Sequence, residues 1–198
     1  MKTITAKPRS VLFRIVLIAL ACTCLTVTAR ADDWPAARPS IFASGAHGLK
    51  VFPKDWTGVL FSLDDDGKEK VIWTKQLVNF PHQAFVAGDG KGVVTIDTWA
   101  DLGREHSLVV YNDKGKVVGD YRLEDLLSEQ EIRDRTIAFS PNRYWNEDAS
   151  FRFRYDGKNE IEYFDITLKW GKTITVNLDS GKLKLEGPPN KTLNRSGG

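Results

Sequence analysis

The chain has no cysteine beyond its first 24 residues, since its two cysteines are Cys22 and Cys24. A domain built from the later residues therefore has no disulfide, no thiolate nucleophile and no cysteine metal site. The three histidines, His47, His82 and His106, match no paired metal-binding spacing. No Gly-x-Ser-x-Gly elbow or phosphate-binding glycine loop is present. Thiol, serine hydrolase and nucleotide-dependent mechanisms thus lack support, and we expect no cofactor.

Long apolar runs are also lacking. The longest, from Ile15 to Val27, has 13 residues, whereas a membrane-spanning helix needs about 20. It follows a basic segment and precedes Ala29-Arg30-Ala31, which is typical of a signal peptide cleaved after Ala31. We expect residues 1–31 to be removed, leaving an exported, periplasmic or extracellular chain with no transmembrane segment. Lipidation at Cys22 is the less favoured alternative, because Leu20 lies one position too close to the cysteine.

Positive charge is scarce in the expected mature chain. Residues 1–31 hold five of the 28 basic residues and none of the 26 acidic ones, which leaves 23 basic against 26 acidic residues and a net charge of −3. The basic character of the full chain therefore comes from the leader. Composition gives no reason to expect a nucleic-acid partner.

The dipeptide Gly-Lys is abundant instead. It occurs six times, at Gly67, Gly90, Gly115, Gly157, Gly171 and Gly181. A glycine in this setting supplies a positive-φ position that closes a hairpin, and three of these turns have an Asp two residues earlier that can cap the turn through its side chain. These three are Asp65, Asp113 and Asp179. The spacing of about 24 residues predicts successive β-hairpins.

The hairpins predict a mainly β fold of antiparallel repeats that resembles a truncated β-propeller or a compact sandwich. About 140 ordered residues allow two to three blades, and closed propellers have at least four, so one chain cannot close a ring. We favour the compact arrangement. The expected organisation is an N-terminal strap at 32–46, one β-rich domain at 47–186 and a disordered tail at 187–198.

One short helix is predicted near 123–133, because Leu123, Leu126 and Leu127 fall on one face with acidic residues outside. We expect it to cover an open end of the sheets with its leucines. A partner-binding helix is the alternative.

Strict alternation in 151–155 and 160–164 predicts a further hairpin. With 157–159 as its loop, Arg154 lies opposite Glu162, Phe153 opposite Tyr163 and Tyr155 opposite Ile161. We expect Arg152 and Arg154 to lie on a solvated face with a cross-strand ion pair. An anion-binding stripe is the alternative.

The densest polar cluster lies in the loop 97–106. Asp97, Asp101, Glu105 and His106 are residue types that coordinate divalent metals, and loops held by rigid strands often carry function. Their spacing matches no known metal motif, so a solvated connection is the simpler interpretation. A metal-dependent enzyme that uses this loop is the alternative functional hypothesis.

Six tryptophans raise the prospect of ligand binding by aromatic stacking. Trp99 and Trp145, with the neighbouring Tyr144, lie on predicted connections and are the candidates for an exposed stacking surface. An indole that covers the end of a sheet is the alternative.

The segments 95–99, 108–111 and 121–127, with Gly115, resemble a group of uncharacterised exported bacterial proteins that have propeller-like β-repeats. The resemblance spans about half of the mature chain and implies a Gram-negative envelope or extracellular setting. No activity is assigned to that group, so it supplies no catalytic residue. The leading functional hypothesis is an exported, non-catalytic β-repeat module that binds a protein or a glycan. Its oligomeric state does not follow from the sequence.

Overall fold

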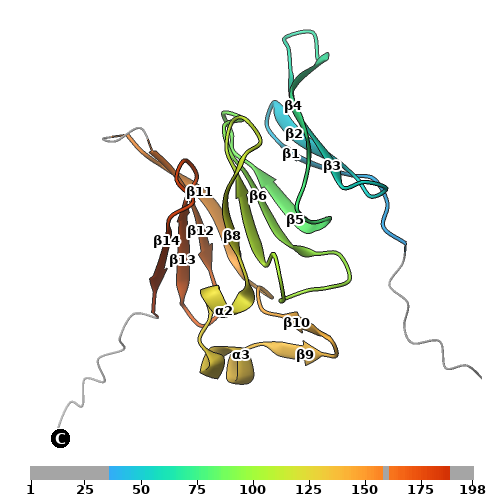
Figure 1. The fold of residues 1–198 in the computed structure, drawn as a ribbon. Coiled ribbons are helices and arrows are strands. Elements are labelled where there is room, and N and C mark those ends of the chain that lie inside the picture. The colour runs from blue at the N-terminus through green and yellow to red at the C-terminus, as the bar shows by residue number, and fades with distance from the viewer. Residues whose placement is uncertain (1–35, 158–160, 188–198) are drawn as a thin grey trace, which may run out of the picture. The chain divides into compact units, whose positions relative to one another are not determined.

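The computed structural model describes residues 36–157 and 161–187, and their fold is mainly β (Figure 1). Three four-stranded antiparallel sheets follow one another along the chain, and within each sheet the strands pair in chain order. The first sheet contains β1 (Ser40–Ser44), β2 (His47–Phe52), β3 (Thr57–Leu63) and β4 (Glu69–Gln76). The middle sheet contains β5 (Pro81–Val86), β6 (Val93–Thr98), β7 (Leu108–Tyr111) and β8 (Val117–Tyr121). The last sheet contains β11 (Ser150–Asp156), β12 (Ile161–Thr167), β13 (Thr173–Asn177) and β14 (Leu183–Glu186).

The predicted mainly β class of antiparallel hairpins is therefore confirmed. Every sheet has two edge strands, so the described residues form no closed barrel, and their three four-stranded sheets are too few for a closed propeller. The predicted signal peptide, lipidation site and most of the predicted tail lie outside the described residues.

All six Gly-Lys dipeptides lie between consecutive strands of one sheet, as the hairpin prediction requires. Five of the six glycines have a positive φ, and Gly157 is the exception. The predicted caps need a correction. The side chains of Asp64 and Asn112, three residues before their glycines, accept backbone N–H groups two and four residues further on. An Asx side chain accepts from N–H groups that follow it in the chain, so Asp64 and Asn112 at the start of each turn are the caps, rather than the predicted Asp65 and Asp113.

The middle sheet is buried on both faces, and all residues of β7 are buried. One face packs on the first sheet through Val93, Val109 and Tyr111. The other face packs on the last sheet through Val94, Ile96 and Val110. Because both faces are covered, β7 is a continuous apolar run, and β6 is buried from Val93 to Asp97 although it includes the polar Thr95 and Asp97.

The predicted N-terminal strap at 32–46 contains a strand in the part that the structure describes. Residues 40–44 form β1, which pairs antiparallel with β2 along its whole length. A positive-φ Gly45 lies in the turn between them. Segment 36–46 is rich in small residues and has weak alternation, so it shows no strand signal until β2 is present to pair with it.

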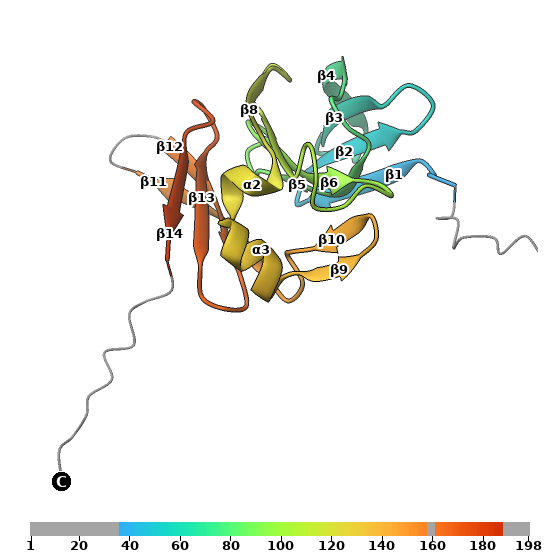
Figure 2. The same ribbon diagram turned by 60° about the horizontal axis from the view of Figure 1, so that its bottom comes forward.

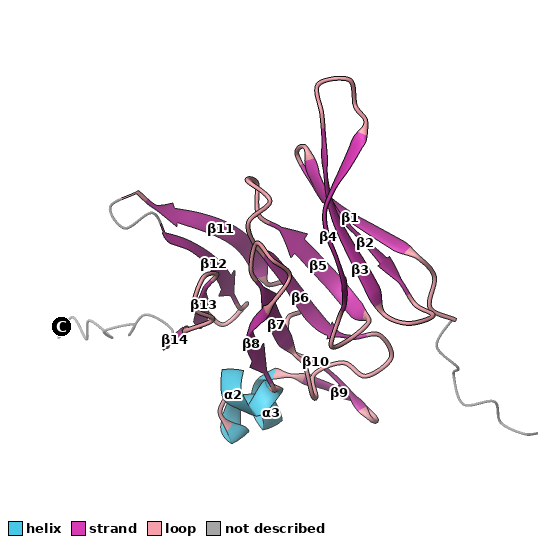
Figure 3. Ribbon diagram, turned by 45° about the horizontal axis from the view of Figure 1, so that its top comes forward, coloured by secondary structure: helices cyan, strands magenta, loops and turns pink. Residues whose placement is uncertain are grey.

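The predicted helix is two short helices, α2 (Leu123–Leu126) and α3 (Glu129–Arg135), drawn in yellow in Figures 1 and 2 and in cyan in Figure 3. They are separated because Ser128 is the N-cap of α3 and forms a capping box with Glu131. The three leucines Leu123, Leu126 and Leu127 are buried in the core between the middle and last sheets, so their predicted docking is confirmed. A two-stranded hairpin of β9 (Ile137–Phe139) and β10 (Asn142–Tyr144) follows α3.

The predicted register of β11 and β12 is wrong by one residue. Arg154 lies opposite Tyr163, and Phe153 lies opposite Phe164. The buried apolar residues of β12 are Phe164 and Ile166, whereas Tyr163 is only half-buried. The side-chain pattern of 160–166 fits two registers, and the apolar core against the middle sheet selects the one that buries Phe164.

Candidate functional site

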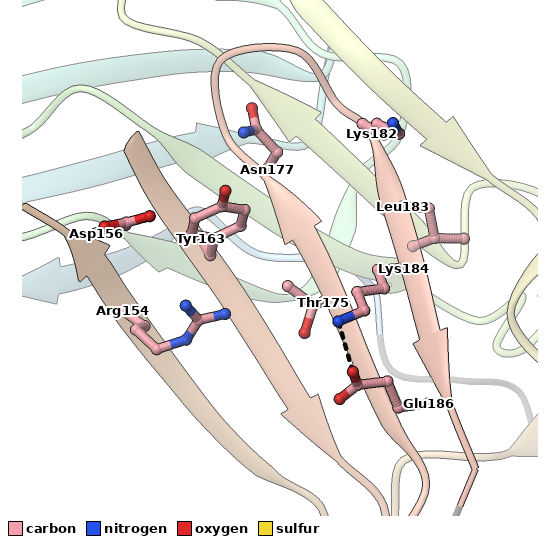
Figure 4. Close-up of a pocket in the computed structure, with 9 residues that line it drawn as sticks. All are labelled: Arg154, Asp156, Tyr163, Thr175, Asn177, Lys182, Leu183, Lys184 and Glu186. Carbon is pink, nitrogen blue, oxygen red and sulfur yellow. Dashed lines mark ion pairs between the residues drawn. The ribbon is translucent and has the colours of Figure 1, made fainter. Parts of the chain in front are cut away.

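The outward face of the last sheet carries a polar groove. Phe151, Phe153, Phe164 and Val176 point to the core, so the alternate residues of the same strands point away from it. A cavity of about 520 Å³ opens on that outward side (Figure 4). We call it the last-sheet groove. It is lined by Arg154, Asp156, Tyr163, Thr175, Asn177, Lys182, Leu183, Lys184 and Glu186.

A buried carboxylate, that of Asp165, lies beside this groove and bonds to two of its lining residues, Arg154 and Thr175. Asp165 is only 5% exposed, and it accepts hydrogen bonds from Arg154 Nε at 3.0 Å, from Arg152 at 3.3 Å and from Thr175 Oγ1 at 2.8 Å. Burial by itself would raise its pKa, but these three donors lower the pKa below its ordinary value. Asp165 therefore stays ionised and fixes both arginines over the sheet.

The position of Arg154 is further defined by an aromatic ring. Its guanidinium lies over the ring of Tyr163 at 4.7 Å from the centroid, an arrangement in which a cation is attracted to the π face. The predicted pairing of Arg154 with Glu162 is wrong, because the register places Glu162 opposite Tyr155 and the guanidinium meets Asp165 instead.

Three donor groups remain available to a ligand in this groove: the Tyr163 hydroxyl, the Asn177 NH2 group and the Lys182 ammonium. The amide oxygen of Asn177 is not available, because it accepts hydrogen bonds from the turn at 179–180. The half-buried Tyr163 and Asn177 lie on neighbouring strands, and Lys182 stands at the end of the groove (Figure 4). Lys184 pairs with Glu186 at 2.6 Å, whereas Lys182 makes no ion pair with any described residue. The phenol, the amide and the free ammonium all donate hydrogen bonds.

The predicted site residues of loop 97–106 are placed in separate environments. Asp97 is 2% exposed and accepts hydrogen bonds from Gly103 N at 2.8 Å and from the indole nitrogen of Trp145 at 3.0 Å. Its burial raises its pKa to about 7, against the lowering effect of these hydrogen bonds. Asp97, Ala100 and His106 all have positive φ, so the loop is held in a backbone conformation that non-glycine residues rarely adopt.

The other three predicted metal ligands each contact a different partner. Asp101 pairs with Arg104 at 3.5 Å, and Glu105 pairs with Arg122 at 3.3 Å. His106 Nδ1 lies 2.9 Å from Asp120, which belongs to β8. Residues 36–157 and 161–187 contain no group of three or more His, Cys, Asp or Glu that could hold a metal ion. The structure therefore does not bring the four predicted ligands together.

The predicted aromatic candidates are also separate. Trp145 is 1% exposed, so the expectation of an exposed stacking ring is wrong for this residue. It is buried because it fills the core between the middle and last sheets. Trp99 is half-buried beside the first and middle sheets, with its ring 5.7 Å from that of His82. Tyr144 is half-buried on β10.

Comparison with known proteins gives a plain result. No family model, curated protein or solved structure matches this chain. In that part of the chain, no helix has both the length and the apolar character needed to cross a membrane.

Sequence reasoning missed most of the last-sheet groove, although a signal for it was present. Polar residues recur at alternate positions in four consecutive strands, beginning with Arg152 and Arg154 on β11 and ending with Lys184 and Glu186 on β14, with Ile161 as an exception. Such a stripe predicts a polar sheet face once the strands are aligned. The predicted β11–β12 register is wrong by one residue, so it does not align these polar residues on one face of the sheet.

Proposed function

We propose that the mature chain is an exported, non-catalytic module of propeller-like β-repeats that binds an oxygen-rich, acidic glycan in the last-sheet groove. The observation that carries this proposal is the set of three available donors, Tyr163, Asn177 and Lys182, beside the rigid Asp165 network. Tyr163 and Asn177 lie on strands, and donors held in this way match ligand oxygens with little loss of side-chain freedom on binding.

A glycan suits the groove better than a protein partner does. Protein interfaces depend on a few apolar or aromatic anchors in dry pockets. Leu183 is the one aliphatic residue in the lining, and the ring of Tyr163 is already engaged by Arg154. The ammonium of Lys182 favours a sugar that carries a carboxylate, because the other groove cations have ionic partners within the protein.

The state of two carboxylates, Asp165 beside the groove and Glu186 in its lining, supports binding rather than catalysis. Asp165 is held ionised by three donors, so it is a poor proton donor near neutral pH. Glu186 is engaged by Lys184. The lining includes no His, Cys or Ser to act as a base or nucleophile.

The test is calorimetric titration of residues 32–198 with a uronic acid oligosaccharide, a neutral glucose oligosaccharide of equal length and an acidic peptide. We expect binding of the uronate oligosaccharide alone. Lys182→Ala should weaken it roughly tenfold, the effect of one charged hydrogen bond. Lys68→Ala is the matched control, because Lys68 follows a positive-φ glycine in the equivalent turn of the first sheet.

Equal weakening by the two alanine variants would show unspecific charge attraction and refute the groove as the site. Binding of the peptide in preference to both sugars would refute the glycan assignment.

A further inference from the structure

The first sheet has an outward face that is unlike that of the last sheet. Its inward residues, Leu49, Val51, Leu60 and Trp73, are buried against the middle sheet. On the opposite side, large apolar residues are open to solvent among the described residues. Ile41 is 64% exposed, Val71 is 55% exposed and Phe52 is 40% exposed.

The strand register shows that these residues form one continuous surface. Paired residues of neighbouring antiparallel strands share a face. Ile41 lies opposite Lys50, Lys50 lies opposite Val59, and Phe61 lies opposite Val71. We call this surface the first-sheet outer face. It includes Ile41, Lys50, Phe52, Val59, Phe61, Leu63, Glu69 and Val71, together with the polar Thr57 and Thr74. Phe61 is itself only 6% exposed, so the open apolar surface comes from the other apolar residues.

Arrays of repeated units normally end in units with a polar outer surface, which keeps the array soluble. The last sheet meets this rule, because its outward residues include Arg152, Arg154, Asp165 and Lys184. The first sheet does not meet it. A contiguous apolar patch of this kind marks an interaction surface.

We propose that the first-sheet outer face binds the same face of a second copy of this chain, giving a dimer with two-fold symmetry. In such a contact, apolar residues meet apolar residues. A head-to-tail contact would instead place Ile41 and Val71 against Arg152 and Arg154, whose side chains are 71% and 44% exposed, and remove those charges from water without new partners. The two-fold arrangement leaves the charged last sheet exposed at both ends of the six-sheet assembly.

The charges on this face fit a two-fold partner. Lys50 and Glu69 form an ion pair there, and the lysine also lies 5.0 Å from the centroid of the Phe61 ring. Because the face carries one charge of each sign, a two-fold axis can bring Lys50 of one copy to Glu69 of the other. Strands about 4.8 Å apart that rise about 3.4 Å per residue give a footprint of roughly 20 × 20 Å. That is roughly 400 Å² per copy, about half of the area that each partner buries in a standard interface, so the dimer should be weak and reversible.

The test is sedimentation of residues 32–198 at concentrations from about 1 to about 100 µM, the range suited to a small interface. We expect a concentration-dependent dimer. Val71→Lys and Ile41→Lys should each give monomers that retain the circular dichroism spectrum of the parent. Leu185→Lys is the matched control, because Leu185 is 43% exposed but belongs to the last sheet, and it should still dimerise.

Charge reversal tests the two-fold contact itself. Lys50→Glu and Glu69→Lys should each weaken the homodimer, while an equimolar mixture of the two variants should form a heterodimer of acidic and basic faces. A parent protein that stays monomeric at the highest concentration would overturn the proposal. So would chains longer than a dimer, which indicate head-to-tail contact, or a mixture that fails to associate. Binding of the uronate oligosaccharide is measured on the same variants and should not change. The dimer and the glycan site in the last-sheet groove can therefore fail independently.

Discussion

The two junctions of the middle sheet are held together differently. The junction with the first sheet is apolar and follows a short connection at 77–80. Polar contacts there come from the connection itself: the Tyr111 hydroxyl accepts a hydrogen bond from Val78 N at 3.1 Å, and the buried Asn79 side chain donates to Asp97 O at 3.0 Å. The junction with the last sheet also has an apolar core, but the connection from β8 to β11 contains α2, α3 and the β9–β10 hairpin. Two carboxylates, Asp97 and Glu131, tie that insertion to the sheets.

The difference shows what each kind of contact contributes. Apolar burial is sufficient to stack two sheets that a short connection already places side by side. It does not by itself fix a long insertion in one position, because apolar contact is non-directional. The indole of Trp145 donating to Asp97, and Lys172 donating to Glu131 at 2.6 Å, supply that direction.

Among substitutions at the two junctions, the largest loss of stability should come from changing Asp97. Asp97→Ala leaves the buried Trp145 and Gly103 N–H groups without an acceptor and puts alanine at a positive φ. We expect a loss of about 4 kcal/mol in the free energy of unfolding, measured with urea. Asp97→Asn keeps an acceptor oxygen and tolerates positive φ, so it should lose much less. Equal losses would show that hydrogen bonding is not what holds the loop.

Comparing the parent protein with Asp97→Asn tests how the free energy of unfolding depends on pH. Because the folded-state pKa of Asp97 is raised to about 7, the folded chain retains a proton that the unfolded chain has released above about pH 4. This group therefore lowers the free energy of unfolding as pH rises from about 4 to about 7, and adds no further change above that range. The slope should be smaller in Asp97→Asn, and an unchanged slope would contradict the assignment.

A smaller effect of opposite pH dependence is expected at Glu131. Burial opposes its ionisation, yet hydrogen bonds from Lys172, Ser128 and Trp170 lower its pKa to about 2. The stabilisation is therefore fully present above the ordinary pKa of a glutamate, about 4.3, and is lost as pH falls toward 2. Glu131→Gln should cost about 2 kcal/mol at neutral pH and progressively less in acid.

Urea titrations at several pH values measure this difference. Glu129→Gln is the matched control, since Glu129 is exposed in the first turn of the same helix and should change stability by no more than about 0.5 kcal/mol. If the cost of Glu131→Gln is the same at pH 3 and pH 7, its charge is not the source of the stabilisation.

The smallest effect should be at the apolar junction. Tyr111→Phe keeps the buried ring and removes the hydroxyl that accepts from Val78 N. We expect a loss of about 1 kcal/mol in thermal or urea unfolding, with little pH dependence below pH 9 because burial raises the pKa of Tyr111 to about 12. A loss as large as that of Asp97→Ala would remove the distinction between the two junctions.

Local features of this chain could be predicted from the sequence, because they depend on neighbouring residues. The Gly-Lys turns and the buried leucines of α2 are examples. The strand β1 could not be predicted, since its residues have weak β character and depend on β2 as a partner. For the same reason the register of β11 and β12 required knowledge of the core that selects Phe164.

The candidate sites depend on contacts between distant residues. Trp145 is 48 positions from Asp97, and no spacing rule links an indole to a carboxylate over that separation. The last-sheet groove was hidden for a different reason. Its polar alternation is visible in each strand, but only the correct register places Tyr163 beside Arg154 and Asn177.

The consecutive order of strands within every sheet has a consequence for how the chain folds. Each sheet pairs only strands that follow one another in the sequence, so its assembly requires the closure of short loops rather than long ones. Isolated hairpins form in about 1–10 µs, and folding slows as contacts become more distant in sequence. We therefore expect each sheet to form early as a local unit, with docking of the 122–149 insertion between the middle and last sheets as the slow step.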